Sequence, residues 1–142
     1  MKVEFVNDIP DGEKVGACII LVDKFTNKLY LSRRKGEYET GKYACPGGMV
    51  ELNEDWTSAA IREIAEETGL KLKFPEVKYL ATCRHDGAKS NYTVWFKAYL
   101  NGNQIPQNKE PHKHEDWLLY SKAEAMALPL MLSTQEIFEK IL

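Results

Sequence analysis

The sequence predicts an α/β domain in which helices cover a β-sheet. Strand-like apolar runs lie on both sides of one amphipathic helix, and strands and helices follow one another without strict alternation. A chain of 142 residues is long enough to bury one hydrophobic core. We therefore expect a single domain over residues 1–142.

The N-terminal part of the chain predicts a hairpin, a loop and two short strands. Residues 14–23 form a β-branched apolar run, and a turn at residues 25–28 leads into a second run at residues 29–34. Residues 35–42 are polar and punctuated by glycine, which is typical of a loop. Residues 43–52 predict a short strand, a Pro-Gly-Gly turn and another short strand before the helix.

A helix is predicted between a polar cap and a glycine. Asn53 or Asp55 can cap its first turn, and Gly69 suits the left-handed position just after its end. Its apolar stripe can face the core and consists of Thr57, Ala60, Ile61 and Ile64. This helix therefore has a predicted start, a predicted buried face and a predicted end.

The opposite face of this helix carries three glutamates. Glu63, Glu66 and Glu67 stand at i, i+3 and i+4, within an arc of about 100°. Like charges at this spacing repel and raise one another's pKa, and a hard divalent cation removes that conflict. Mg2+ prefers oxygen ligands, and the backbone of Gly47 and Gly48 can approach an ion or a phosphate closely. The run REIAEE by itself leaves open the alternative of a solvated acidic face.

The chain after the helix predicts three strands and one long polar segment. Residues 70–74, 77–84 and 92–100 are strand-like, and residues 85–90 read as a hairpin turn. The polar residues 101–113 suit the wall of a site or a flexible segment.

A last strand and two helices complete the prediction. Residues 115–120 form the strand, and a capping-box signature from Ser121 to Glu124 opens a short helix. A second signature from Ser133 to Glu136 opens a terminal helix. The side chains expected to dock this helix on the core are Ile137, Phe138 and Ile141.

The composition argues against a membrane protein and against a general affinity for polyanions. The formal net charge of −2 gives no overall attraction to nucleic acid or to anionic membranes. No apolar run approaches the roughly 20 residues of a membrane-spanning helix, and the N-terminus lacks the apolar stretch of a signal peptide. We therefore expect a cytoplasmic protein that binds neither a membrane nor a nucleic-acid duplex.

The cysteines predict neither a disulfide framework nor a zinc site. Cys18, Cys45 and Cys83 are odd in number, widely spaced and without a CxxC pair. Cys18 and Cys83 lie in strand-like runs and are expected to be buried small hydrophobic residues. Cys45 could line a site beside the glycines, but no base lies near it in the sequence, so we do not expect it to be a nucleophile.

The spacing around the acidic helix matches a known signature. Residues 48–70 fit the pattern G-x5-E-x7-R-E-U-x-E-E-x-G-U, in which U is aliphatic. The matching residues are Gly48, Glu54, Arg62, Glu63, Ile64, Glu66, Glu67, Gly69 and Leu70. From ordinary residue frequencies, such a match arises by chance on the order of 10^-9 per starting position. This pattern is the Nudix box, and the chain resembles a Nudix hydrolase.

The resemblance implies a fold, a reaction and a cofactor. Nudix proteins share an α/β/α sandwich with a mixed β-sheet, which agrees with the element order above. Nudix enzymes hydrolyse a diphosphate linkage in a nucleotide with the help of a divalent metal. Mg2+ is the implied ion, with Mn2+ as the alternative, and relatives are often homodimers.

The box also implies which residues hold the metal. Glu63 and Glu67 are the expected side-chain ligands, and the carbonyl of Gly47 is the expected backbone ligand. Glu66 is expected either to be a third ligand or to receive the proton from water. The general base differs among members of the family, so this assignment stays open.

Arginines have two expected roles. Arg62 is expected to orient the acids through a salt bridge, because it lies about 100° around the helix from Glu63, and Glu54 is expected to support the box. A guanidinium recognises phosphate with a rigid fork, and similar proteins often place an arginine before the box. Arg34 is favoured over Arg33 for this contact, with a solvated surface charge as the alternative.

Residues near the last strand are further candidates. Several Nudix enzymes use a late acid as an additional metal ligand or base, which makes Glu115 and Asp116 candidates beside Trp117, with a surface role as the alternative. Magnesium prefers oxygen, so the histidines are expected to be exposed loop residues. They are His85, His112 and His114.

Three stretches suggest the branch of the family. RRKG, YACPGG and EP...EDW resemble the MutT-like enzymes, which cleave nucleoside triphosphates, including oxidised or modified dNTPs, to monophosphates and diphosphate. The proline that many ADP-ribose enzymes carry beyond the box is replaced by His85, and the SQPWPFPxS array of NADH-cleaving members is absent. A (d)NTP is therefore the expected substrate. The alternatives are an ADP-ribose or nucleotide-sugar hydrolase and a module that binds nucleotide without turnover.

Overall fold

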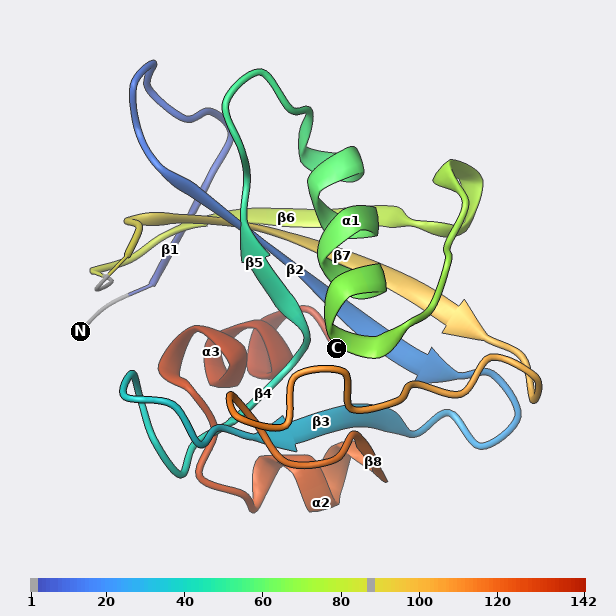
Figure 1. Cartoon of the computed structure of the whole chain (residues 1–142). Coiled ribbons are helices and arrows are strands. Elements are labelled where there is room, and N and C mark those ends of the chain that lie inside the picture. The colour runs from blue at the N-terminus through green and yellow to red at the C-terminus, as the bar shows by residue number, and fades with distance from the viewer. Residues whose placement is uncertain (1–2, 87–88) are drawn as a thin grey trace.

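The structure, a computed structural model, describes residues 3–86 and 89–142. Within these residues it contains eight strands, three α-helices and one 3-10 helix (Figure 1). They are β1 Glu4–Val6, β2 Val15–Asp23, β3 Leu29–Arg33, β4 Tyr43–Ala44, β5 Gly47–Met49, α1 Trp56–Thr68, η1 Phe74–Glu76, β6 Lys78–Arg84, β7 Tyr92–Leu100, β8 Leu118–Tyr120, α2 Lys122–Met126 and α3 Leu132–Lys140.

The strands form one mixed sheet with the order β1-β6-β7-β2-β3-β4, and β5 pairs with β2 while β8 pairs with β3. The pair β2–β7 is parallel and the other named pairs are antiparallel. The two long strands lie at the centre of this sheet and are buried on both faces, which explains their nearly continuous apolar sequences. The predicted mixed sheet is confirmed.

Side chains alternate between two cores along β2. Ala17, Ile19 and Leu21 join the residues of α1 in one core. Ile20 and Val22 point to the other face and join the residues of α2 and α3 in a second core. The sheet therefore lies between helices on both faces (Figure 1), which confirms the predicted α/β/α sandwich.

Helix α1 begins and ends where its sequence signals lie. The Asp55 carboxylate accepts a hydrogen bond from the backbone N–H of Ser58 at 2.8 Å, and Gly69 takes a left-handed φ of 77° after the last turn. Ala60 and Ile64 are buried against the sheet, as the apolar stripe predicts. This packing fixes the rotation of the helix and so the direction of its acidic side chains.

The predicted Pro-Gly-Gly turn is wrong at its glycines. Gly47 and Gly48 belong to β5 and pair with Cys18 and Ala17 of β2. A Cβ on Gly47 would collide with the carbonyl oxygen of Ala17 and would lie 2.9 Å from the Cα of Cys18. The two strands approach closely here because Gly47 lacks a side chain.

The predicted strand at residues 70–74 is also wrong. Leu70 and Leu72 are buried in the core beside α1, which produces the alternating pattern. The segment has no strand partner in the described part of the chain and turns into η1 at Phe74, with Pro75 in its first turn. The alternation of apolar and polar residues here reflects the burial of Leu70 and Leu72 and not pairing with another strand.

Helix α3 does not start at the predicted cap. Its N-cap is Met131, so Ser133 lies inside the first turn. Tyr43 donates its N–H to Pro129 and accepts one from Met131, which keeps the preceding backbone extended up to that point. Ile137 and Phe138 are buried as predicted, whereas Ile141 is exposed and does not dock on the core.

The polar segment 101–113 packs across the end of α1. The backbone N–H of Gln107 donates to the carbonyl of Thr68 at 2.9 Å, and that of Lys109 donates to Glu67 at 3.2 Å. These bonds satisfy carbonyl groups that the helix itself leaves unpaired. The predicted hairpin between β6 and β7 agrees with their antiparallel pairing, although residues 87–88 of its turn lie outside the described residues.

No helix in the described part of the chain combines the length and the apolar character that crossing a membrane requires.

Candidate active site

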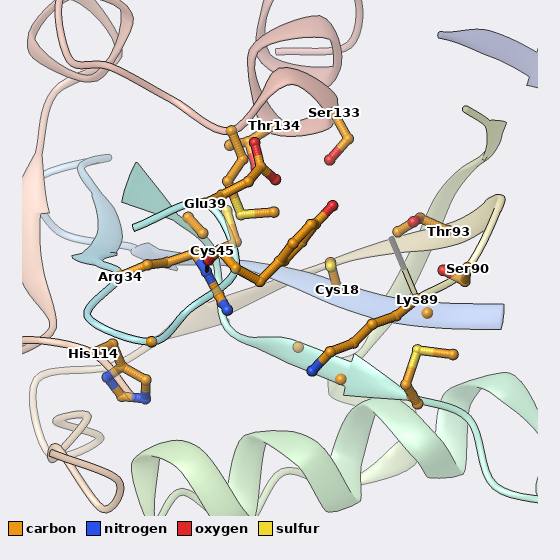
Figure 2. Close-up of a pocket in the computed structure, with 18 of the residues that line it drawn as sticks. Cys18, Arg34, Glu39, Cys45, Lys89, Ser90, Thr93, His114, Ser133 and Thr134 are labelled. Atoms are coloured by element: carbon orange, nitrogen blue, oxygen red, sulfur yellow. Dashed lines mark hydrogen bonds between the residues drawn. The ribbon is translucent and has the colours of Figure 1, made fainter. Parts of the chain in front are cut away.

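A cavity of about 620 Å³ opens beside β5. Strand β5 and the acidic face of α1 form one wall, and the loops after β3 and before β8 form another. Part of β2, the end of β6, the start of β7 and the start of α3 complete its lining (Figure 2). The cavity thus joins residues from seven separate parts of the sequence, and Glu63 and Glu67 are the box acids among them.

Glu67 is the most deeply buried acid of this cavity, with only 9% of its surface exposed. Its Oε1 accepts a hydrogen bond from the backbone N–H of Gly47 at 2.7 Å, so α1 and β5 are tied together at the site. Burial raises the pKa of Glu67 to about 8 against the opposing hydrogen bond from Gly47, and the charges of Glu63 and Glu110 raise it further. The metal-free site therefore holds a carboxylate that lacks sufficient positive charge around it.

Glu63 lies against the backbone of Gly48. A Cβ on Gly48 would overlap the carboxylate of Glu63, so only glycine leaves room for this acid. Burial raises the pKa of Glu63, while its hydrogen bond with Arg62 opposes the shift. The position of the Glu63 side chain therefore explains the glycine at the start of the box.

Arg62 connects the loop before α1 to the acids. Its Nε and Nη2 donate to the two carboxylate oxygens of Glu54 at 2.8 and 2.9 Å, and its Nη1 donates to Glu63 at 2.8 Å. Its Nη2 also donates to the carbonyl of Met49 at 2.9 Å. Arg62 does not line the cavity. Arg62 thus links Met49, at the end of β5, to Glu63, which is the position expected of a residue that orients the acids.

Replacing Glu54 by glutamine is expected to lower the free energy of unfolding by about 1–2 kcal/mol at pH 7, because it removes the charge that faces Arg62. The Arg62 hydrogen bonds lower the pKa of Glu54 from its ordinary value of 4.5 to about 2. The carboxylate therefore contributes its full stabilisation above pH 4.5 and loses it as the pH falls toward 2. Urea unfolding of both proteins at pH 7 and pH 3 measures this. A difference between them that does not shrink at pH 3 would contradict the assignment.

Glu66 is not part of the cavity lining, whereas Glu110, which the sequence analysis did not single out, is part of it. Glu66 is exposed, contacts Arg62 Nη1 at 3.3 Å and is not part of the cavity lining. Glu110, from the polar segment before β8, lines the cavity and forms an ion pair with Lys113 at 3.1 Å. The third carboxylate beside Glu63 and Glu67 thus comes from a loop far away in the sequence.

His114 was expected to be an exposed loop residue, and this prediction is wrong. It is 4% exposed and packs against the ring of Trp117, with 4.7 Å between ring centroids. The loop places it there because Glu115 donates its backbone N–H to Arg33, and His114 bridges to Arg34 at the end of β3. His85 also lines the cavity, whereas His112 is exposed as predicted.

The two neighbouring arginines point to different places. Arg34 lines the cavity, where its Nε donates to the Tyr38 carbonyl at 2.8 Å and its guanidinium lies 5.6 Å from the centre of the Tyr38 ring. Arg33 is half exposed and forms an ion pair with Glu115 at 2.9 Å, outside the cavity lining. The structure brings Arg34 to the acids and leaves Arg33 and Glu115 outside.

Trp117 lies behind the site. Its ring is buried, and its Nε1 donates to the backbone carbonyl of Glu67 at 3.3 Å. It is not among the residues that line the cavity. Trp117 therefore contacts both the ring of His114 and the helix that carries Glu67. From this position it supports these two residues and does not face the cavity.

Cys18 and Cys45 both line the cavity, and all three cysteines are free. Cys18 is only partly buried, contrary to expectation, whereas Cys45 and Cys83 are buried. Burial raises the pKa of the Cys18 thiol to about 12 and holds the pKa of Cys45 well above its ordinary value. A thiolate nucleophile is therefore disfavoured at this site.

The residues present fit a divalent cation. Glu63, Glu67 and Glu110 line the cavity, and Arg62 and Lys113 pair with Glu63 and Glu110. The pKa of the buried Glu67 nevertheless stays raised, so its charge is not fully balanced. Glu67, Glu110 and His114 each offer a ligand atom within 4.8 Å of the others. Oxygen-rich donor sets of this kind suit Mg2+ and Mn2+.

Comparison with known sequences gives a family match and several relatives. A family model described as NUDIX domain matches residues 12–141. The ADP-ribose pyrophosphatase of Methanocaldococcus jannaschii is 48% identical over 54 residues, which are 38% of this chain and 30% of that protein. The 8-oxo-dGTP diphosphatase of Escherichia coli is 25% identical over 111 residues, covering 75% of this chain and 81% of the relative.

Other curated relatives are much longer than the matched part. The ADPR responsive transcriptional repressor NtrR of Acinetobacter baylyi is 26% identical over 112 residues, which cover 77% of this chain and 45% of the repressor. The chain thus spans less than half the length of this repressor and of the M. jannaschii enzyme.

Solved structures have the same fold. A MutT NUDIX hydrolase from Burkholderia pseudomallei superposes with a TM-score of 0.78 at 26% identity, covering 91% of this chain and 98% of that one. The NUDIX domain of Shewanella oneidensis NrtR complexed with ADP ribose superposes with a TM-score of 0.75 at 20% identity, covering 91% and 86%. The second likeness is one of fold alone.

Proposed function

The chain belongs to the NUDIX domain family, and from this premise we propose that it is a metal-dependent hydrolase of a nucleotide diphosphate linkage. The observation that carries the proposal is the pair Glu63 and Glu67, held against the glycine backbone of β5 and facing a cavity of about 620 Å³. A cavity of this volume can hold a nucleotide-sized ligand.

The protein's residues hold the reacting groups in place. When bound, Mg2+ or Mn2+ supplies positive charge for the phosphate oxygens and makes water more acidic. Glu63 and Glu67 would hold the ion, and Gly47 and Arg62 would keep these two carboxylates in position. The oxygen of water bonds to a phosphorus atom, the bridging P–O bond breaks, and a neighbouring carboxylate receives the proton.

A nucleoside triphosphate, as a (d)NTP, is the substrate that the charges favour. Arg34, Lys89 and Lys113 line the cavity beside the acids. Figure 2 shows Arg34 and Lys89 entering it from different sides. Several separate cations match a chain of three phosphates better than a single diphosphate bridge. The products would be a (d)NMP and diphosphate.

The similarity to the E. coli 8-oxo-dGTP diphosphatase supports this choice, because it covers most of both chains. ADP-ribose is the second candidate. The local identity of 48% with an ADP-ribose pyrophosphatase favours it, although the match spans only 54 residues. A module that binds nucleotide without cleaving it is the third reading, and the complete set of box acids argues against it.

A substrate panel separates these functions. The protein is incubated with Mg2+ or Mn2+ and with dNTPs, 8-oxo-dGTP, ADP-ribose and a nucleotide sugar, and products are resolved by anion-exchange chromatography. We expect release of diphosphate and a monophosphate from a triphosphate. Cleavage confined to ADP-ribose or the sugar nucleotide would overturn the substrate assignment. Nucleotide binding without cleavage would overturn the proposal that the protein is an enzyme.

A further inference from the structure

His114 presents an unpartnered nitrogen to the acidic cavity. The side chain is 4% exposed, and its Nε2 has no hydrogen-bond partner among the described residues. The nearest carboxylate oxygen, Oε2 of Glu67, lies 3.6 Å away, which is too long for a hydrogen bond. A buried polar atom in this state needs a partner, and its position indicates where that partner would lie.

The other ring nitrogen fixes the tautomer. His114 Nδ1 lies 3.1 Å from the backbone carbonyl of Glu115. A carbonyl oxygen only accepts hydrogen bonds, so Nδ1 carries the proton and the neutral ring has a lone pair on Nε2. Metal-bound histidines usually donate their second N–H to such a carbonyl, which holds the ring in orientation.

This lone pair faces other electron-pair donors. Nε2 and the carboxylates of Glu67 and Glu110 lie within 4.8 Å of one another. Trp117 packs on the ring from behind and donates to the Glu67 carbonyl, so the two elements that carry His114 and Glu67 are held together. The three side chains come from α1 and from one loop. Lys113 pairs with the Glu110 carboxylate at 3.1 Å, whereas His114 Nε2 has no partner among the described residues.

We propose that His114 is a nitrogen ligand that completes a cation position with Glu67 and Glu110. The inference rests on the proposed function, because Glu67 also belongs to the catalytic metal site. An imidazole ligand favours transition-metal ions over Mg2+, and carboxylates accept Mn2+ readily. The position therefore selects Mn2+ over Mg2+ within a family site built otherwise from oxygen.

Pulsed EPR of the protein loaded with Mn2+ tests the ligand directly. Without any nucleotide, we expect a 14N coupling from one directly bound imidazole in the unmodified protein. The same coupling is expected to disappear in His114→Asn and to persist in His112→Asn, whose histidine is exposed on the same loop. Because the first measurement uses the unmodified protein, it does not depend on the folding of a variant.

Binding calorimetry measures the selectivity. His114→Asn is expected to weaken Mn2+ binding by at least about 10-fold and to leave Mg2+ binding within about 3-fold, whereas His112→Asn changes neither. Absence of a 14N coupling in the unmodified protein, or equal losses for both ions, overturns the inference. The EPR signal requires no substrate, so it tests the metal ligand alone. A lack of turnover for every nucleotide in the substrate panel would overturn the proposed function without affecting this test.

Discussion

Glu67→Gln is expected to lower kcat for nucleotide cleavage by about 10^3-fold or more, because the proposed metal site would lose its most enclosed carboxylate. The amide oxygen can still accept the hydrogen bond from Gly47, so the fold is retained. The measurement is diphosphate release from the best substrate of the panel at saturating Mg2+. Unchanged activity would contradict the proposed site.

The same substitution is expected to stabilise the metal-free protein at alkaline pH. Burial raises the pKa of Glu67 from 4.5 to about 8, so the folded state binds its proton more tightly than the unfolded state. Wild-type stability therefore falls as the pH rises from 4.5 to 8, and the full cost remains above pH 8. Thermal unfolding in EDTA at pH 9 is expected to give a Tm about 3 °C or more above wild type, with little difference at pH 4.5.

Glu13→Gln is the matched control, because Glu13 is exposed and lies outside the cavity lining. It removes the same charge and is expected to change neither kcat nor the pH dependence of Tm. If Glu13→Gln also raised Tm at pH 9, the gain in Glu67→Gln would result from the change in net charge and not from the burial of Glu67.

Gly48→Ala is expected to lower kcat by about 10^2-fold while leaving the protein folded. The new Cβ overlaps the carboxylate of Glu63, the end of a flexible side chain, which can move aside at small cost to the fold. Displaced from its place, Glu63 would no longer hold the proposed metal. Gly47→Ala is expected to act differently, because its Cβ meets the backbone of β2 and so destabilises the sheet.

Activity assays together with urea unfolding separate these two effects. Gly102→Ala is the control, since its Cβ would find only ordinary contact with the Phe25 ring at 3.7 Å. We expect near wild-type stability and low activity for Gly48→Ala, and reduced stability for Gly47→Ala. Full activity of Gly48→Ala would show that the position of Glu63 does not matter for turnover.

Much of the fold could be predicted because its signals are local. Asp55 and Gly69 mark the two ends of α1. They do so through hydrogen bonds and a backbone angle that involve only neighbouring residues. The strand-like apolar run of β7 likewise depends on the residues of one strand. The strand predicted at 70–74 is wrong because alternation records burial, and a strand also needs a partner from elsewhere in the chain.

The site divides in the same way. The spacing of the box brings Arg62 within hydrogen-bond distance of Glu54 and Glu63, since all three lie on α1 or in the loop before it. The polar composition of residues 101–113 allows a site wall or a flexible segment, but no local pattern indicates that Glu110 and His114 reach the cavity. Their loop is positioned by backbone bonds to β3 and to the end of α1, from partners remote in the sequence.

The sequence by itself determined the family, the sandwich and the acidic helix that faces the glycines, because these depend on residue order and helical spacing. Only the tertiary structure decided that Arg34 and not Arg33 enters the cavity, that Glu66 stays outside, and that His114 is buried beside Glu67. Which side chains meet at a site depends on how separate loops pack, and packing energies act between residues whatever their separation along the chain.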